Sequence, residues 1–508
     1  MTMRSKMVLR FYLIPIFVFV FFCGPAFSQG LTPAMQAATS WIEQNKATYD
    51  EIAKFIWDNP ELSLVEFKSS AKLMDYLAKN GFKIEKGMSG MPTAFVATYG
   101  SGKPVIGFLA EYDALPSLSQ ESGVTTAKPI IAGAPGHGCG HNLYGTSSAT
   151  AAIAAAQAMQ KQGIKGTIKV FGTPAEETLV GKVFMNRDGV FDGTDVIITW
   201  HPGDENRVEY QSLLAFMSIK FQFHGRSAHA AAAPEHGRSA LDAVMLMNLG
   251  MEFMREHLIQ EARIHYVNPK GGETPNNVPP FAETYYFIRS PRWAQVEHIW
   301  KWMQNVAKGA ALMTETKMTY QILTVTYERL PNRTLAKMGD EMMKLVGAPS
   351  FTPEDQKFGA AVIQSLGKEW KEEPYSTKIV TPNFAATFPN VPVTKASNDQ
   401  GNLSWRIPIL GFGAATETKF TPGHSWQVVC QEKTEPGLKA GLQVSKWMAV
   451  SALKLMTDPE IIQAAWAEHG KYLADLGAYK EPLPQDVKVP TFEMLYGMKP
   501  ENVPGAKK

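Results

Sequence analysis

Short apolar runs alternate with helical stretches along most of the chain. A stretch from Thr32 to Asn80 has helical periodicity, and an alanine-rich stretch from Ser147 to Lys161 ends at Gly163. Buried strands separated by helices are typical of a parallel α/β sheet. The apolar runs that we expect to form this sheet are Val105–Ala110, Thr167–Phe171, Val196–Trp200 and Ile407–Phe412.

The middle of the chain has a different order of elements. A first helix is expected over Arg238–Glu256, and a second carries apolar residues at helical spacing from Val296 to Met303. The expected strands around these helices are Ala215–Phe223, Arg263–Val267, Thr284–Ile288 and Lys317–Thr326. The order β-α-β-β-α-β predicts a ferredoxin-like domain. The apolar stripe expected to bury the first helix is Leu241, Val244, Met245 and Leu249.

The first thirty residues have the order of a secretory signal peptide. Arg4, Lys6 and Arg10 precede an apolar run from Phe11 to Phe22, and small residues follow at Ala26 and Ser28. A single membrane anchor is the alternative, but the run is shorter than the ~20 residues that span a bilayer. We therefore expect export to the periplasm or the medium, with no membrane attachment after cleavage.

These patterns divide the chain into a leader, a split catalytic domain, an inserted domain and a tail. Residues 1–28 are the expected signal peptide, and residues 481–508 form a tail whose place the sequence does not indicate. Residues 213–328 are the expected inserted ferredoxin-like domain. The catalytic α/β domain is then formed by residues 31–212 together with residues 329–480.

Length, composition and charge exclude several classes of protein. A chain of 508 residues is too long for one core, and 45% hydrophobic residues exclude a mainly disordered chain. The net charge of +2 belongs to the leader, because removing residues 1–28 leaves 47 basic and 48 acidic residues. A nearly neutral chain gives no reason to expect nucleic-acid binding. Three cysteines are too few for a disulfide framework.

Carboxylate or imidazole side chains follow each of the four apolar runs. In open α/β sheets, ligands bind beyond the carboxyl ends of the strands, so these side chains should meet at one edge. A fifth cluster, His137 to His141 with Cys139 at its centre, stands before the alanine-rich helix. The residues that follow the runs are Glu111 and Asp113, Glu176 and Glu177, His201, and His424.

This mixture of side chains predicts a metal site. Imidazole, thiolate and carboxylate together suit Zn²⁺, Mn²⁺ or Co²⁺, whereas an all-oxygen site would suit Ca²⁺ or Mg²⁺. The groups exceed the three that a mononuclear catalytic site needs, which favours two ions with a shared water. Because Glu176 and Glu177 cannot both point the same way, one can bind metal while the other acts as a general base.

At these residues the sequence resembles a known family. The motifs LAEYDALP, GHGCGHN, PAEE, HPG and TPGHSW occur in this order around the expected insert. They are similar to those of the dinuclear metallo-amidohydrolases and metallopeptidases of the carboxypeptidase G and amino-acid-conjugate hydrolase type, with the greatest likeness to the aminobenzoyl-glutamate hydrolase branch. The resemblance implies a phosphorylase/hydrolase-like mixed-sheet catalytic domain with an inserted ferredoxin-like dimerisation and lid domain.

The resemblance also implies roles for individual residues. Glu176 matches the general acid/base, and His229 matches a histidine that stabilises the oxyanion, often across a dimer interface. Asn276 and Arg289 match residues that bind the substrate carboxylate. Many peptidase branches have His-x-Asp where this chain has Glu111 and Asp113, which we therefore expect to lie behind the ligands. The implied metal ligands are Cys139, His141, Glu177, His201 and His424.

The expected activity is metal-dependent hydrolysis of an N-acyl amino acid, most closely aminobenzoyl-glutamate or a related conjugate. The expected cofactors are two divalent ions, Mn²⁺ or Zn²⁺, with Co²⁺ as a further candidate. One alternative is a metallo-dipeptidase or carboxypeptidase, and another is a metal-binding or peptide-binding protein without turnover. The expected assembly is a homodimer, or a heterodimer with a partner that resembles the A subunit of such hydrolases.

Overall fold

The catalytic domain is built on a mixed eight-stranded sheet. The computed structural model describes residues 30–506, so the expected signal peptide lies outside the described residues. The strand order is β1-β2-β4-β3-β5-β14-β6-β12. Its four central strands run parallel and contain the four apolar runs. These strands are β4 (Gly166–Gly172), β3 (Val105–Ala110), β5 (Val196–Gly203) and β14 (Ile409–Ala415).

Several outer strands run antiparallel to their neighbours in the sheet. β2 runs antiparallel to β4, β1 to β2, and β6 to β14. The sheet is therefore mixed, as the family resemblance implies, and the parallel arrangement predicted from the apolar runs holds for its four central strands. The chain reverses over the two residues between β5 and β6, so β6 runs antiparallel to β14, which lies between these two strands. The outer strands are β1 (Lys83–Lys86), β2 (Phe95–Ser101), β6 (Asn206–Val208) and β12 (Ile379–Val380).

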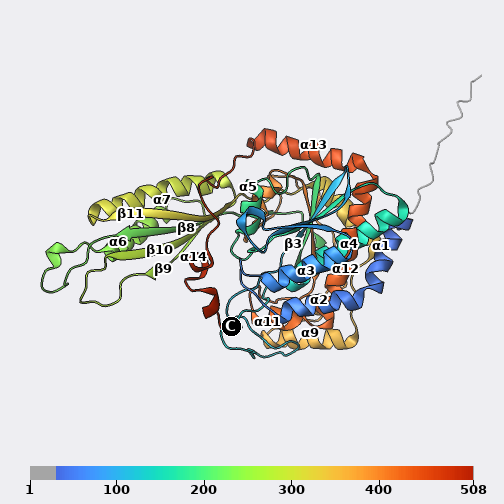
Figure 1. The fold of residues 1–508 in the computed structure, drawn as a ribbon, viewed down its shortest axis with the longest axis horizontal. Coiled ribbons are helices and arrows are strands. Elements are labelled where there is room, and N and C mark those ends of the chain that lie inside the picture. The colour runs from blue at the N-terminus through green and yellow to red at the C-terminus, as the bar shows by residue number, and fades with distance from the viewer. Residues whose placement is uncertain (1–29, 507–508) are drawn as a thin grey trace, which may run out of the picture.

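One layer of helices covers a face of this sheet, with α3, α4, α12 and α8 packed side by side (Figure 1). Helix α4 begins at His141, six residues before the expected start, because Gly140 adopts a left-handed conformation with φ of 69° just ahead of it. The helices of the catalytic domain are α1 (Pro33–Gln44), α2 (Lys46–Asp58), α3 (Phe67–Lys79), α4 (His141–Gln162), α5 (Gly181–Arg187), α8 (Arg333–Val346), α9 (Pro353–Ser365), α10 (Gly401–Ser404), α11 (Trp426–Glu432), α12 (Glu435–Thr457) and α13 (Pro459–Leu476).

The inserted domain is a four-stranded antiparallel sheet with two helices on it. Its strand order is β11-β8-β10-β9, in which the fourth strand lies beside the first and the third beside the second. This is the ferredoxin-like pattern, so the predicted fold class is confirmed. Figure 1 shows the domain projecting from the catalytic domain as an elongated arm. Its elements are β8 (Ala215–His224), α6 (Ala240–Arg255), β9 (Arg263–Lys270), β10 (Phe281–Ser290), α7 (Trp293–Met313) and β11 (Lys317–Thr326).

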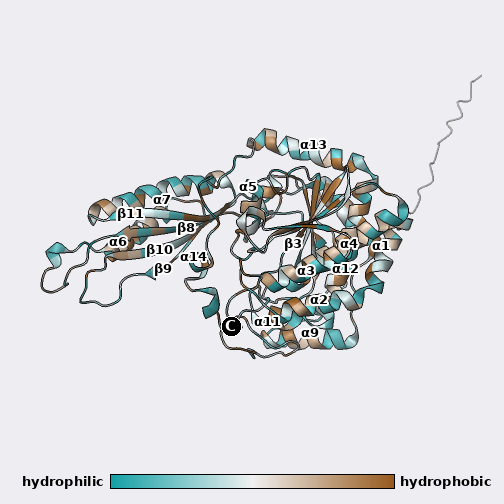
Figure 2. Ribbon diagram, in the orientation of Figure 1, coloured by the Kyte–Doolittle hydropathy of each residue, from teal (hydrophilic) through white to brown (hydrophobic). Residues whose placement is uncertain are grey.

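Helix α6 buries a different stripe from the expected one. Val244 is fully buried, but Met245 is 61% exposed and Leu249 is 52% exposed. The prediction is wrong for these two side chains because α6 is apolar on two faces. The face that packs on the sheet includes the fully buried Met247 and Met251, whereas Met245 and Leu249 are exposed. Figure 2 shows hydrophobic and hydrophilic residues alternating along the ribbon of α6. The helix therefore leaves an apolar surface uncovered.

The tail lies between the two domains. The Tyr327 hydroxyl at the end of the inserted domain donates to the Lys480 carbonyl at 3.1 Å. Farther on, the tail forms α14 (Phe492–Tyr496), which lies between the arm and the catalytic domain in Figure 1. The predicted boundaries at residues 212, 328 and 480 stay predictions. Between residues 30 and 506, no helix is long and apolar enough to cross a membrane.

Candidate active site

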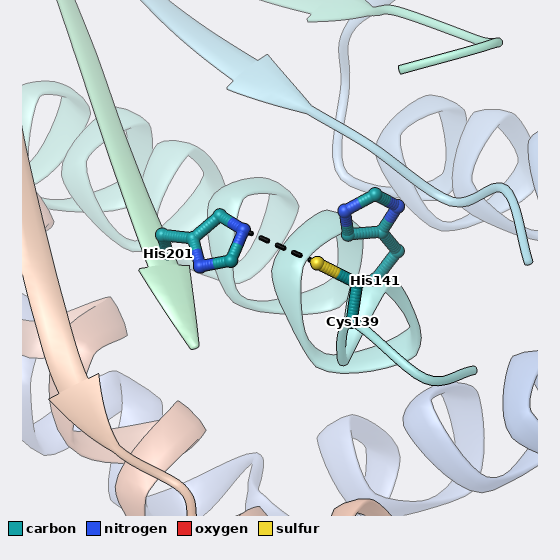
Figure 3. A group of neighbouring side chains, drawn as sticks. All are labelled: Cys139, His141 and His201. Atoms are coloured by element: carbon teal, nitrogen blue, oxygen red, sulfur yellow. Dashed lines mark hydrogen bonds between the residues drawn. The ribbon is translucent and has the colours of Figure 1, made fainter. Parts of the chain in front are cut away.

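The expected ligands meet at the carboxyl ends of the parallel strands. Cys139 and His141 lie at the start of α4, and His201 lies near the end of β5 (Figure 3). The Cys139 Sγ atom is 3.4 Å from His201 Nε2. Ligand atoms of Cys139, His141 and His201 all lie within 4.8 Å of one another. These three side chains form one group able to hold an ion.

A second group shares the cysteine. Ligand atoms of Cys139, Glu177 and His424 also lie within 4.8 Å of one another, and His424 Nε2 is 3.4 Å from Glu177 Oε2. The His424 amide donates to the Gly138 carbonyl at 3.0 Å, which joins the loop after β14 to the loop before α4. The structure thus brings all five expected ligands together, with Cys139 common to both groups.

Asp113 orients His141 and Glu177, and it lies on the Nδ1 side of the His141 ring. Its carboxylate accepts from the Ser63 hydroxyl and from the Glu177 amide, both at 2.9 Å, and its Oδ1 atom is 3.0 Å from His141 Nδ1. Burial opposes ionisation, but the contact with His141 holds the pKa of Asp113 below its ordinary value. With Nδ1 turned to Asp113, the other ring nitrogen of His141 faces the ligand group.

Glu176 lies on the other side of His141. Its Oε2 atom is 3.9 Å from His141 Nε2, and Glu111 Oε2 is 3.3 Å from the same nitrogen. Burial, followed by repulsion from Glu111, raises the pKa of Glu176 well above its ordinary value. Burial raises the pKa of Glu177 to about 8. Glu111, His141 and Glu176 form a third group of closely spaced ligand atoms.

The residues fit a divalent metal. His141 Nε2 and Glu177 Oε1 are buried and have no hydrogen-bond partner among residues 30–506. A buried polar atom without a partner is costly, and a bound ion would satisfy both atoms. The donor set of sulfur, imidazole nitrogen and carboxylate oxygen matches the preferences of Zn²⁺, Mn²⁺ and Co²⁺.

Two of the expected residues lie far from this centre within one chain. His229 and Asn276 are both exposed. The segments that carry them lie side by side, because the Ala230 amide donates to the Asn276 carbonyl at 3.0 Å. They lie in loops at the outer end of the arm, beyond His224. The ten residues of β8 separate this end from the catalytic domain by roughly 30 Å.

Arg289 lies at the opposite end of the inserted sheet. It stands near the end of β10, and its Nη1 atom donates to the Ser397 hydroxyl of the catalytic domain at 3.3 Å. The pKa of His424 is lowered by burial first, then by His141 and His201, and last by the charge of Arg289. Asn276 and Arg289 therefore cannot bind one substrate carboxylate within a single chain.

Sequence reasoning missed two charged residues at the site. Lys182, the second residue of α5, and Asp399 are both fully buried and lie 2.7 Å apart from Nζ to Oδ1. Lys182 also lies 2.8 Å from Glu111. The sequence did contain a signal for Lys182, which stands five residues after Glu177 among apolar neighbours. A lysine in such a segment indicates a buried ion pair, because lysine is rarely fully buried unless it is paired.

Comparisons with known proteins show the family of this chain. Residues 107–396 match the model of peptidase family M20/M25/M40. Over 465 residues the chain is 36% identical to the B subunit of p-aminobenzoyl-glutamate hydrolase from Escherichia coli, covering 88% of this chain and 96% of that protein. The chain belongs to peptidase family M20/M25/M40. The predicted family and the predicted metal-dependent hydrolase are thereby confirmed.

One further relative and one solved structure are similar to this chain. The chain is 29% identical over 336 residues to Xaa-Arg dipeptidase of Mus musculus, covering 63% of this chain and 72% of that enzyme. A crystal structure of aminobenzoyl-glutamate utilization protein from Klebsiella pneumoniae has a TM-score of 0.56 at 18% identity, and the match covers 81% of this chain and 97% of that one. The structural likeness shows a shared fold.

Proposed function

We propose that this M20/M25/M40 family member hydrolyses the amide bond of an N-acyl amino acid, with aminobenzoyl-glutamate or a related conjugate as its substrate. The observation that carries the proposal is the convergence of four ligand-type side chains on Cys139, with Glu176 beside them. The name of the Escherichia coli relative supports the substrate class. We further propose two bound ions, Mn²⁺ or Zn²⁺, with Co²⁺ as a further candidate.

Glu176 is the proposed general acid/base. Bound ions would polarise the acyl carbonyl and lower the pKa of a bound water toward ~7. Glu176 takes a proton from the attacking water and returns it to the leaving amide nitrogen as the carbon–nitrogen bond breaks. Burial raises the pKa of Glu176, which favours the protonated form that returns the proton to the leaving nitrogen.

His229 is proposed to stabilise the oxyanion from a second copy of the chain. Its Nδ1 atom accepts from the Ala231 and Ala232 amides, each at 3.2 Å, so the ring proton lies on Nε2. An exposed Nε2–H group can donate to an oxyanion. Because His229 lies at the outer end of the arm, only a second chain could place it beside Glu176. Asn276 of the second chain would lie beside His229. It would bind the substrate carboxylate together with Arg289 of the chain whose active site holds the substrate.

The uncovered face of α6 supports a homodimer. Met245, Leu249 and Phe253 are 61%, 52% and 65% exposed, and apolar surfaces of this kind mark protein interfaces. We expect the double variant Met245→Glu/Leu249→Glu to be monomeric in light scattering. Its kcat should fall about 10²–10³-fold, because a monomer lacks the oxyanion donor that a second chain supplies. The control Leu345→Glu, which alters a partly exposed residue of the catalytic domain, should keep both properties.

A dimeric double variant would contradict the assignment of this interface. A monomer with unchanged kcat would show that His229 does not act between chains. The alternative assembly is a heterodimer, because the name of the Escherichia coli relative is that of a B subunit and therefore implies an A subunit as its partner. Co-purification of a different chain with the protein from its native cells would favour the heterodimer.

Amine release from a panel of substrates tests the proposed reaction. Metal-loaded protein is expected to release free amino acid from aminobenzoyl-glutamate or other N-acyl amino acids, and a chelator should abolish release. Likeness to Xaa-Arg dipeptidase makes dipeptides with a carboxyl-terminal arginine the second candidate substrates. Preferred cleavage of these dipeptides would replace the proposed substrate class. No release from any substrate would favour a binding protein without turnover.

We also propose that the chain is exported and that its leader is removed after Ser28. The basic residues, apolar run and small residues of positions 1–28 support this proposal. Amino-terminal sequencing of the protein from its native cells should begin at or near residue 29. An intact Met1 in protein from the cytosol would contradict it.

A further inference from the structure

A completely buried lysine lies beside the candidate active site. Lys182 Nζ is 2.8 Å from Glu111 Oε1 and 2.7 Å from Asp399 Oδ1. All three side chains are at most 1% exposed. Removing such charges from water costs several kcal/mol per ion, and comparably sized apolar side chains are often neutral or stabilising replacements. Stability alone therefore gives little reason for a charged cluster at this position.

Glu111 connects the lysine to the site. One of its carboxylate oxygens contacts Lys182, and the other lies 3.3 Å from His141 Nε2. The same nitrogen lies 3.9 Å from Glu176 Oε2. The ammonium group thus binds one oxygen of Glu111 and leaves the second facing His141 and Glu176.

Asp399 fixes the lysine in turn. Its Oδ1 atom accepts from Lys182 Nζ, and its Oδ2 atom accepts from the Lys182 backbone amide at 2.9 Å. Asp399 thereby holds both the side chain and the first turn of α5, the helix that follows Glu176 and Glu177. Two contacts from one carboxylate leave Lys182 little freedom to move.

The cluster also balances charge. Glu111, Glu176, Glu177 and Asp399 are mutually repelling carboxyl groups within this pocket. Burial alone would lower the pKa of Lys182, but Asp399 and Glu111 raise it above its ordinary value. The lysine is therefore a permanent cation among them. Unlike a dissociable ion, it stays in place when the metal content of the site changes.

We propose that Lys182 is a positioning residue for hydrolysis: its ammonium group clamps Glu111 and Asp399, so that Glu111 presents one oxygen to His141 and Glu176. This inference rests on the proposed roles of His141 and Glu176. Lys182 itself contacts neither substrate nor any expected ligand. It acts through Glu111, whose second oxygen lies 3.3 Å from His141 Nε2 and in the same group of ligand atoms as Glu176.

The test uses a neutral cluster of nearly the same shape. The triple variant Glu111→Gln/Lys182→Met/Asp399→Asn removes every charge, while the amide oxygen introduced at position 399 can still accept from the backbone amide of residue 182. At saturating metal, we expect kcat to fall about 10–100-fold while KM stays within about threefold. Metal affinity is expected to weaken by about tenfold. Lys182→Met alone leaves two buried carboxylates unpaired, so we expect it to unfold at a lower temperature than the triple variant.

A matched buried pair provides the control. Lys220 and Glu283 in the inserted sheet lie 3.2 Å apart with side chains 10% and 9% exposed, and neither contacts the site. Lys220→Met/Glu283→Gln should keep the wild-type kcat and metal affinity. A folded triple variant with wild-type kcat and metal affinity would overturn the proposal. So would an equal loss of kcat in the control pair, because buried charge removal in general would then explain the effect.

The two proposals fail in different ways. If the triple variant is fully active while Glu176→Gln is not, the role of Lys182 is wrong and the proposed function stands. If the wild-type protein releases no amine, the proposed function fails. The metal affinity of the triple variant then decides about Lys182, since unchanged affinity would contradict its action through Glu111.

Discussion

Replacement of Glu176 by glutamine is expected to lower kcat by about 10²–10⁴-fold, the usual contribution of a positioned general acid/base. The amide has nearly the shape of the carboxylate but cannot take a proton from water. Glu176 belongs to neither group of ligands around Cys139, so the variant should bind its ions as the wild type does. The measurements are kcat with the best substrate of the panel and metal content per chain.

Glu354→Gln is the matched control for this variant. Glu354 is an exposed carboxylate in the first turn of α9, and its replacement should leave kcat unchanged. Near-native kcat in Glu176→Gln would refute the assigned role. Loss of metal would instead identify Glu176 as a ligand, because it also lies in the group with Glu111 and His141.

Replacement of Cys139 by alanine is expected to reduce metal content from about two ions per chain to less than about one, and to abolish turnover. Its sulfur is the only ligand atom common to the groups with His201 and with His424 among the described residues. Burial, followed by repulsion from Glu177, raises the pKa of Cys139. A bound ion would reverse this by stabilising the thiolate.

Cys430→Ala controls for the loss of a thiol. Cys430 is fully buried, and its Sγ atom donates to the Gln427 carbonyl at 3.2 Å rather than facing the ligands. This variant should keep its ions and its kcat. If Cys139→Ala retains two ions per chain, the sulfur does not bind metal, and the remaining histidines and carboxylates must hold both ions.

Much of the catalytic domain could be predicted because its central strands are buried on both faces. Such strands appear as continuous apolar runs, and each run here is one of four adjacent parallel strands. Parallel strands carry their carboxyl ends to one edge, so Glu177, His201 and His424 had to lie near one another. The candidate ligands were predictable for the same reason.

The errors have physical causes as well. The outer strands β1, β6 and β12 were missed because they have four, three and two residues, too few to show an apolar pattern. Helix α6 is apolar on two faces, and only packing on the inserted sheet decides that Val244 is buried while Leu249 is exposed. Asn276 and Arg289 belong to one domain, yet the length of the inserted sheet separates them within a chain.

The sequence by itself determined the family, the α/β architecture with its ferredoxin-like insert, and the types of side chain available for catalysis. These follow from local periodicity and from motifs that keep their order along the chain. Only the tertiary structure decided which carboxylates lie behind the ligands and which ammonium group holds them. Lys182, Glu111 and Asp399 are distant in sequence, and their pairing depends on distances of a few ångströms that only the packed fold establishes.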